Sequence, residues 1–366
     1  KFVIYQIALN LAAHTLAFLT EVNTSFRRNQ YENRSILRVK ATEWQWNGYD
    51  IFTKVSSPDF VLPFQKTKPS VLLIHGFACS TVYWRETAKA LKKEGYKVHA
   101  LDLLGQGRSA KPGRKDGIEY SIRLWSEIVD AYVAENMGND DVVLVGNSLG
   151  SLVALSAYTG DFTKRAEEGG RVDVKRYKGI CMFNCGVGLN SKGIVKDEQW
   201  NPFQRSLISF LLSLLDILIF KNLRLLQYVL DEVVSKELLR DTLQSLYKFD
   251  PSRVDDSLVD SFYFPGKDAG SAEVLSQIYS NDPGLTPMEL HNKYPEKLNG
   301  FPISLIWGDT DSITPLDRGV GIFYQNLASD ETSNVSLEVV KSGHVPFDDN
   351  PIESNAVMLE WLKNIN

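Results

Sequence analysis

Short, almost wholly apolar runs recur along the chain and alternate with stretches of helical periodicity. The runs with strand character are SVLLIHGF (70–77), YKVHALDL (96–103), VVLV (142–145), YKGICMFN (177–184), ISLIWGD (303–309) and VSLEVV (335–340). Runs without polar alternation are typical of parallel strands buried on both faces. Helical patterns separate them, as in residues 121–136 and from about Glu353 onward. The pattern predicts an α/β fold with a mainly parallel sheet and helices on both faces.

A hairpin is predicted ahead of the first buried run. The stretch WQWNGYDIFTKV, from Trp44 to Val55, places Asn47-Gly48 between two strand-like halves. That dipeptide favours the tight turn that joins antiparallel strands.

The strand pattern stops between Cys185 and Pro295. SLISFLLSLLDILIF and LRLLQYVLDEVVSKELLRDTLQSLY read there as apolar helices, and Asp216 within the first argues against a membrane span. We therefore predict a helical cap over residues 191–294. It is inserted between two parts of one sheet domain, 41–190 and 295–366.

Residues 1–40 form a separate unit. Phe2 to Thr20 contains no charged side chain, yet Gln6, Asn10 and His14 draw a polar stripe along an apolar helical pattern. Three interpretations stay open: a helix docked on the protein, an interfacial membrane helix, or the remainder of a targeting segment. Basic residues follow and suit peripheral contact with an anionic membrane: Arg27, Arg28, Arg34, Arg38 and Lys40.

Composition narrows the function classes. The 366 residues carry a formal net charge of −5 with no basic run, which gives no reason to expect a nucleic-acid partner. The 3 cysteines, Cys79, Cys181 and Cys185, are too sparse for a disulfide framework and lack further ligands for a zinc site. We expect neither a metal site nor a cofactor.

The strongest chemical signal is Ser148 in VVLVGNSLGSLVAL. A buried strand leads directly into Gly146-Asn147-Ser148-Leu149-Gly150 and then into a helical pattern. Strand, sharp turn, serine and helix make up a nucleophile elbow, in which small neighbours let the backbone turn sharply. Ser148 is the predicted nucleophile.

A serine hydroxyl needs a base held by an acid, in the chain order serine, acid, histidine. His344 follows a predicted strand in VVKSGHVPFDD and is the predicted base, whereas His291 reads as a surface residue of the insertion. Asp311 in LIWGDTDSITP is the preferred acid, and Asp309 the alternative. An oxyanion hole needs two backbone N–H groups, which we assign to Leu149 and Phe77.

Two further side chains are candidates near the substrate. His75 precedes the glycine of the HGFACS loop, where it either contacts substrate or braces the loop. Trp84 either walls the pocket or belongs to the core.

These residues also carry a family resemblance. The chain resembles a cap-bearing α/β-hydrolase, and within that superfamily it is similar to plastid chlorophyll dephytylases and pheophytinases. The resembling stretches run from Trp44 to the C-terminus: WQWNGYDIFTKV, LLIHGFACSTVYWRETAKAL, YKVHALDLLGQGRSAKP, LVGNSLGSLVAL, LIWGDTDSITP, SGHVPFDDNP and two cap segments, 220–247 and 255–275. His75 is as in the dephytylases, whereas Ala78 and Ser151 stand where glycine is expected.

The resemblance implies hydrolysis of the ester that joins a chlorin ring to phytol, in the chloroplast stroma or at the thylakoid. A general lipid or carboxylic ester hydrolase remains the first alternative. Haloalkane dehalogenases and epoxide hydrolases share cap and sheet but use aspartate at the elbow, so Ser148 argues against both. A receptor that uses the pocket only for recognition is the remaining alternative.

Overall fold

The computed structural model describes residues 42–58, 68–162, 174–189 and 220–365. Eight strands form one sheet in the order β1-β2-β4-β3-β5-β6-β7-β8. Their bounds are β1 Thr42–Trp46, β2 Tyr49–Ser56, β3 Ser70–Ile74, β4 Val98–Leu101, β5 Val142–Asn147, β6 Tyr177–Phe183, β7 Ile303–Gly308 and β8 Val335–Val340. Strand β2 runs antiparallel to both β1 and β4, and strands β3 to β8 are parallel.

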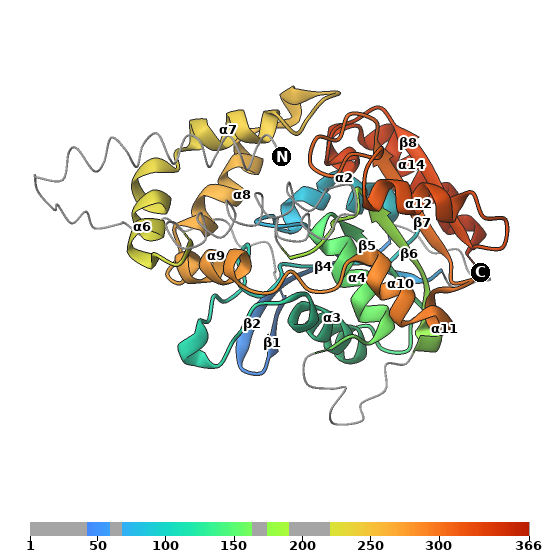
Figure 1. Ribbon diagram of the computed structural model, residues 1–366, viewed down its shortest axis with the longest axis horizontal. Helices are drawn as coiled ribbons and strands as arrows, with labels where there is room; N and C mark the ends of the chain where they lie inside the picture. Colours follow the sequence, from blue (N-terminus) through green and yellow to red (C-terminus); the bar gives the residue numbers. More distant parts are fainter. Residues whose placement is uncertain (1–41, 59–67, 163–173, 190–219, 366) are drawn as a thin grey trace, which may run out of the picture.

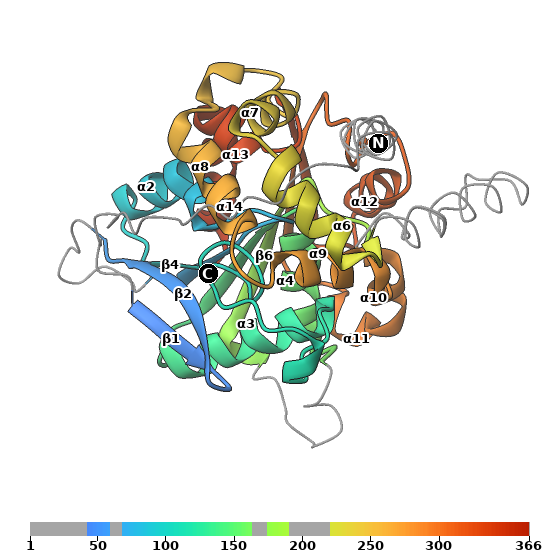
Figure 2. The ribbon, with the colours of Figure 1, turned by 90° about the vertical axis from the view of Figure 1, so that its left-hand side faces the viewer.

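Helices cover both faces of the sheet (Figures 1 and 2). Their bounds are α2 Arg85–Lys93, α3 Ile122–Asn136, α4 Leu149–Thr159, α10 Pro287–Lys293, α11 Pro295–Leu298, α12 Val320–Ala328, α13 Pro346–Asp349 and α14 Pro351–Asn364. Alternate residues of a strand face opposite sides. Leu72 and Ile74 accordingly pack with α3, α4 and α12, whereas Val71 and Leu73 pack with α2 and α14.

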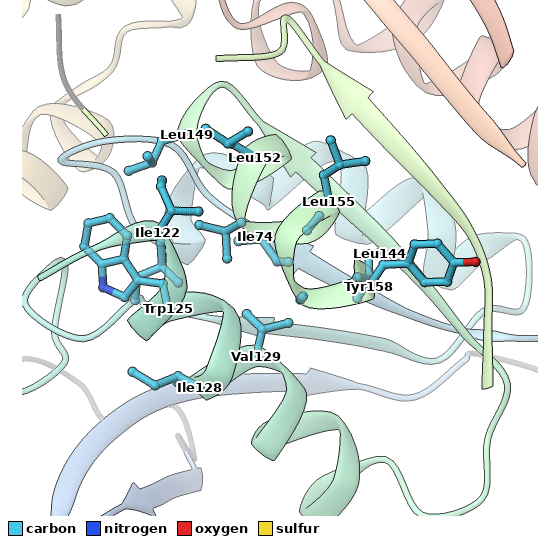
Figure 3. Packing of buried hydrophobic residues seen from close by; sticks show 14 of the residues in the cluster. Ile74, Ile122, Trp125, Ile128, Val129, Leu144, Leu149, Leu152, Leu155 and Tyr158 are labelled. Carbon is cyan, nitrogen blue, oxygen red and sulfur yellow. The ribbon is translucent and has the colours of Figure 1, made fainter. Parts of the chain in front are cut away.

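The larger core cluster lies between the sheet and the pair α3 and α4. Figure 3 shows Ile122 and Val129 of α3 in the space between the two helices, next to Ile74 of β3. Each such aliphatic side chain contributes about 1.5–3 kcal/mol when it is fully buried. This burial fixes the position of β5 and α4, and so of the turn that joins them.

Between β6 and β7 the described chain is helical, as predicted. The cap helices are α6 Leu223–Tyr228, continued by a π-helical turn Val229–Val233, then α7 Lys236–Gln244, α8 Asp256–Gly266 and α9 Ser271–Ser280. They lie together at the left of Figure 1. Helix α10, which falls inside the predicted cap range, packs instead on α4 and α12 of the sheet domain.

The predicted parallel sheet and hairpin are confirmed. Asn47 and Gly48, with φ of 49° and 81°, form the turn between β1 and β2. Residues 1–40 and the apolar segment 206–219 lie outside the described residues. Within the described ranges no helix is both long and apolar enough to cross a bilayer.

Candidate active site

Ser148 occupies a sharp turn between β5 and α4. Its backbone has φ 52° and ψ −116°, a conformation that L-residues rarely adopt. Close approach explains both flanking glycines, because a Cβ at Gly146 would lie 2.4 Å from the Gly150 oxygen and one at Gly150 2.2 Å from the Ile74 oxygen. The N–H of Ser148 donates to the carbonyl of Phe183, which ties the turn to β6. The turn has the strand, sharp turn and helix geometry that the sequence predicts for an elbow at Ser148.

Asp311 and His344 form a buried pair beyond the ends of β7 and β8. Nδ1 of His344 lies 2.9 Å from Oδ2 of Asp311, whose side chain is fully buried. A histidine whose Nδ1 is bonded to a carboxylate presents Nε2 for proton transfer. Asp309 is exposed and accepts a hydrogen bond from the N–H of Ser342, which is a loop contact. Of the two candidate acids, Asp311 is therefore the one that contacts His344.

Hydrogen bonds keep the Asp311 carboxylate ionised. Burial alone would raise its pKa, but His344 and the donors from Asn184 and Thr314 lower it on balance. Asn184 Nδ2 and Thr314 Oγ1 donate to Oδ2 over 2.5 and 2.7 Å, and the N–H of Ile313 donates to Oδ1 over 2.7 Å. The sequence drew no attention to Asn184, although its place at the end of β6 was a usable signal.

Asn147 joins the elbow to the histidine loop, and Asn184 joins the end of β6 to the Asp311 loop. Asn147, next to the serine, donates from Nδ2 to the carbonyl of His344 over 3.2 Å. Asn184 contacts Asp311 and also accepts from the N–H of Gly308. The three predicted residues thus gather at one sheet edge. No hydrogen bond joins Ser148 Oγ to His344 among the described residues.

Two free N–H groups lie beside the serine. Leu149 is the first residue of α4, and Gly76 lies close enough that a Cβ there would be 3.5 Å from Ser148 Cβ. Within the described ranges the N–H groups of Phe77 and Leu149 have no acceptor. Free backbone donors close to the attacked carbonyl are what an oxyanion hole requires.

His75 braces the loop that carries Phe77. It is 1% exposed, and its Nε2 accepts a hydrogen bond from the N–H of Leu103 over 2.9 Å. The proton therefore resides on Nδ1, which donates to the carbonyl of Gly76 over 2.7 Å. Burial lowers the pKa of His75, outweighing the nearby Asp102 carboxylate and the bond to Gly76. Both ring nitrogens are occupied by main chain, which leaves His75 a bracing role instead of a substrate contact.

The structure decides between the two alternatives for Trp84 and differs from the prediction for His291. Trp84, offered as a substrate contact, is 1% exposed and stacks on Phe347 with ring centroids 4.1 Å apart. It belongs to the core. His291, expected at the surface, is buried against Phe323 and Tyr324, and burial lowers its pKa to about 4.

A pair of buried carboxylates just after His344 was not anticipated. Asp349 accepts from Ser342 Oγ and the N–H of Gly343, which precede His344, over 2.8 and 2.9 Å. It also accepts from three consecutive N–H groups of the cap, those of residues 248–250. His344 in turn donates its own N–H to the carbonyl of Leu246. The cap and the loop that carries His344 therefore share one anchor, Asp349.

Asp348 provides a second attachment of the cap. Its carboxylate binds Arg85 of α2 through two bonds of 2.9 and 3.0 Å and accepts from Tyr247 Oη over 2.7 Å. Arg253 donates to the Asp348 carbonyl. In the sequence, the only sign of these attachments was the pair of aspartates in Phe347-Asp348-Asp349, shortly after Gly343-His344.

Comparisons with known proteins agree with this architecture. A family model described as the alpha/beta hydrolase fold matches residues 69–164. The meta-cleavage product hydrolase from Pseudomonas fluorescens superposes with a TM-score of 0.57 and 18% identity, over 87% of this chain and 96% of that one. The chain has the α/β-hydrolase fold. Its antiparallel second strand, elbow and helical insertion after β6 all fit that description.

Sequence relatives match either a short stretch or most of the chain. The probable lysophospholipase BODYGUARD 2 of Arabidopsis thaliana is 33% identical over 121 residues, 31% of this chain and 24% of that protein. The match thus spans about a quarter of that relative. The uncharacterized hydrolase YugF of Bacillus subtilis is 24% identical over 297 residues, 81% of this chain and 90% of that protein.

Metal ligands do not cluster in the part of the chain that the structure describes. There, no group of three or more His, Cys, Asp or Glu side chains is arranged to hold an ion.

Proposed function

We propose that the protein is a serine hydrolase that cleaves a carboxylic ester of a large apolar substrate. The observation that carries this proposal is the buried His344–Asp311 pair at the same sheet edge as Ser148, whose neighbour Asn147 bonds the His344 carbonyl. Free N–H groups at Phe77 and Leu149 complete the set of groups that acyl transfer needs.

The reaction follows from these groups. Ser148 Oγ attacks the ester carbonyl carbon while His344 Nε2 takes its proton, and the oxyanion is bound by the N–H groups of Phe77 and Leu149. The C–O bond of the leaving alcohol then breaks, and that alcohol takes the proton from His344. Water, deprotonated by the same nitrogen, attacks the acyl-enzyme carbonyl. The bond to Ser148 Oγ then breaks, His344 returns the proton to that oxygen, and the acid is released. Asp311 stabilises the imidazolium in both halves of the reaction.

The phytyl ester of chlorophyll or pheophytin is the substrate that the motif resemblance favours. A long isoprenoid gains about 0.8 kcal/mol for each buried methylene, so an apolar cap can supply most of the binding energy. The same assignment would place the enzyme where chlorophyll occurs, in the chloroplast, with residues 1–40 as a contact to the thylakoid surface.

A lysophospholipid or another lipid ester is the second candidate. It is favoured by the similarity of a 121-residue stretch of the chain to a probable lysophospholipase. A single serine mechanism serves both substrates, because the chemistry at the carbonyl is the same and only the groups beyond the ester differ.

One experiment separates these proposals. The purified protein is treated with a fluorophosphonate and the adduct is mapped, then turnover is compared for chlorophyll a, pheophytin a, lysophosphatidylcholine and a medium-chain nitrophenyl ester. We expect the adduct on Ser148, and Ser148→Ala should lower kcat at least about 1,000-fold. Turnover of the nitrophenyl ester alone would end the pigment assignment, and an unlabelled Ser148 would end the hydrolase proposal.

A further inference from the structure

The loop that carries Phe77 contains a conformation that its own sequence does not favour. Ala78 has φ +57°, and it shares a positive φ with only three other non-glycine residues of the described chain, Asn47, Ser148 and Asn184. An asparagine can stabilise such a conformation through its own amide, but alanine has no group to do so. The support for Ala78 must come from elsewhere in the fold.

Gln106 provides that support. Its Oε1 accepts a hydrogen bond from the N–H of Ala78 over 2.6 Å, and its side chain is buried, with 4% of the residue exposed. Because a backbone N–H can only donate, the amide oxygen must be the atom that faces Ala78. The main chain of Gln106 is fixed as well, by bonds to Leu103 and Ser109.

The hydrogen bond to Ala78 leaves the other end of the Gln106 amide, Nε2, without a partner of its own among the described residues. That nitrogen is buried. A buried donor without a partner destabilises the folded state, and a methionine of similar length would avoid that cost. The acceptor atom, Oε1, is therefore what glutamine contributes at this position.

The bond from Ala78 acts on the geometry around Phe77. The peptide before Phe77 is held at its oxygen by His75 Nδ1, and that same peptide carries the Phe77 N–H. The following peptide carries the Ala78 N–H and is held by Gln106. A planar peptide fixed at one end is fixed at the other. With both peptides held, the direction of the Phe77 N–H is set from both sides.

We propose that Gln106 is a positioning residue for the oxyanion hole: it holds Ala78 in its positive-φ conformation and so aims the Phe77 N–H at the reacting carbonyl, without touching the substrate. This inference rests on the proposed serine hydrolase function. It also explains how alanine can stand where the family resemblance leads one to expect glycine.

The first test is Gln106→Met, measured against Arg108→Met. Arg108 joins the same two loops, through bonds to Thr81 Oγ1 and Asp102, but makes none to Ala78. With the nitrophenyl ester we expect Gln106→Met to lower kcat about 10- to 100-fold with KM changed less than about 3-fold, since the oxyanion forms only after binding. Arg108→Met should keep kcat within about 3-fold.

Amide hydrogen exchange tests the bond without relying on turnover. In Gln106→Met the Ala78 amide should exchange at least about 10-fold faster than in the wild type. The Thr81 amide, which donates to Asp102 Oδ1 over 2.6 Å in the same loop, should be unchanged. Equal loss of protection at both amides would mean general loosening and would overturn the positioning role, as would a wild-type kcat in Gln106→Met.

A rescue experiment sharpens the claim. Glycine adopts positive φ without steric cost, so Gln106→Met combined with Ala78→Gly should recover part of the lost kcat. A double variant no better than Gln106→Met contradicts the proposed role of Ala78. If the wild type hydrolyses no ester and takes no fluorophosphonate, the proposed function fails, while the exchange data still decide whether Gln106 holds the loop.

Discussion

The sheet and the described cap bury their residues to very different extents. Strands β3, β5 and β7 bury every residue they contain, whereas α6 and α7 each bury a single leucine, Leu226 and Leu243. The cluster confined to cap helices consists of Leu226 and Ala272 with a few half-buried neighbours, and other cap side chains join the two clusters of the sheet domain.

In the cap, polar contacts contribute more to the attachment than they do in the sheet. Asp348 and Asp349 attach its 247–253 segment, and Lys267 donates to three carbonyls at the end of the π-helical turn, those of Leu230, Asp231 and Val234. Apolar burial is non-directional and fixes a layer as a whole, whereas hydrogen bonds fix single points. Under the proposed function, the difference suits a rigid edge that carries the reacting groups and a cap that binds the apolar part of the substrate.

The largest effect should come from the sheet edge. Asp311→Asn leaves the shape of the site but removes the charge that stabilises the His344 imidazolium, and we expect kcat to fall about 1,000- to 10,000-fold. Ester hydrolysis by the purified variant, with circular dichroism as the control for folding, measures this. A loss below about 10-fold would contradict the role of Asp311.

The same variant makes a pH prediction with a definite sign. Because the folded-state pKa of Asp311 lies below its ordinary 3.8, the carboxylate stabilises the fold at pH values above the unfolded-state pKa. That contribution is lost as pH falls through the lowered folded-state pKa. Urea unfolding should therefore show wild type and Asp311→Asn diverging above about pH 4 and converging in stronger acid. Convergence at neutral pH would contradict it.

The next largest effect should come from Asp349, whose carboxylate binds both the cap and the loop that carries His344. Asp349→Asn places an amide NH₂ against backbone donors, and a buried network broken on one side costs about 3–5 kcal/mol of unfolding free energy. Because the lost bonds include those of Ser342 and Gly343, kcat should also fall, about 10-fold or more.

Asp348→Asn is the matched control for that prediction. It removes a neighbouring buried carboxylate that contacts the cap and α2 but not residues 342–343. Its free energy of unfolding should fall by a similar amount while kcat of the folded fraction changes little. Equal kcat losses in both variants would mean that the cap attachment as a whole, not Asp349, sets the base.

A pair of leucine truncations tests the packing difference directly. Leu144 in β5 is 0% exposed and Leu226 in the cap 2%, so the two substitutions remove comparable buried apolar area. Leu144→Ala should cost about 3–5 kcal/mol, because the surrounding sheet and helices cannot collapse into the cavity. Leu226→Ala, with half-buried neighbours free to move, should cost about 1–2 kcal/mol by urea unfolding. Equal costs would remove the distinction.

The smallest effect should come from an exposed cap ion pair. Arg240 lies 2.5 Å from Asp256, whose side chain is 92% exposed. Such pairs contribute about 0–1 kcal/mol, and the contribution falls with added salt. Asp256→Asn should therefore shift the urea midpoint barely, and a large shift would show that surface charge holds the cap more firmly than its buried carboxylates do.

Local patterns determined much of this molecule. The apolar runs predicted the parallel strands, Asn47-Gly48 predicted the hairpin turn, and GNSLG predicted the elbow, because each depends on the conformational preferences of a few neighbouring residues. Chain order and strand ends were enough to select Asp311 and His344 as a pair.

Contacts between distant segments were decided only by the tertiary structure. Gln106 meets Ala78 across 28 positions and Asp349 meets the cap backbone across about 100, and no local rule connects such residues. The same holds for His75, Trp84 and His291, whose residue types are compatible with either a site or a core. Their roles depend on which other segments surround them, and burial of that kind exists only once the chain has folded.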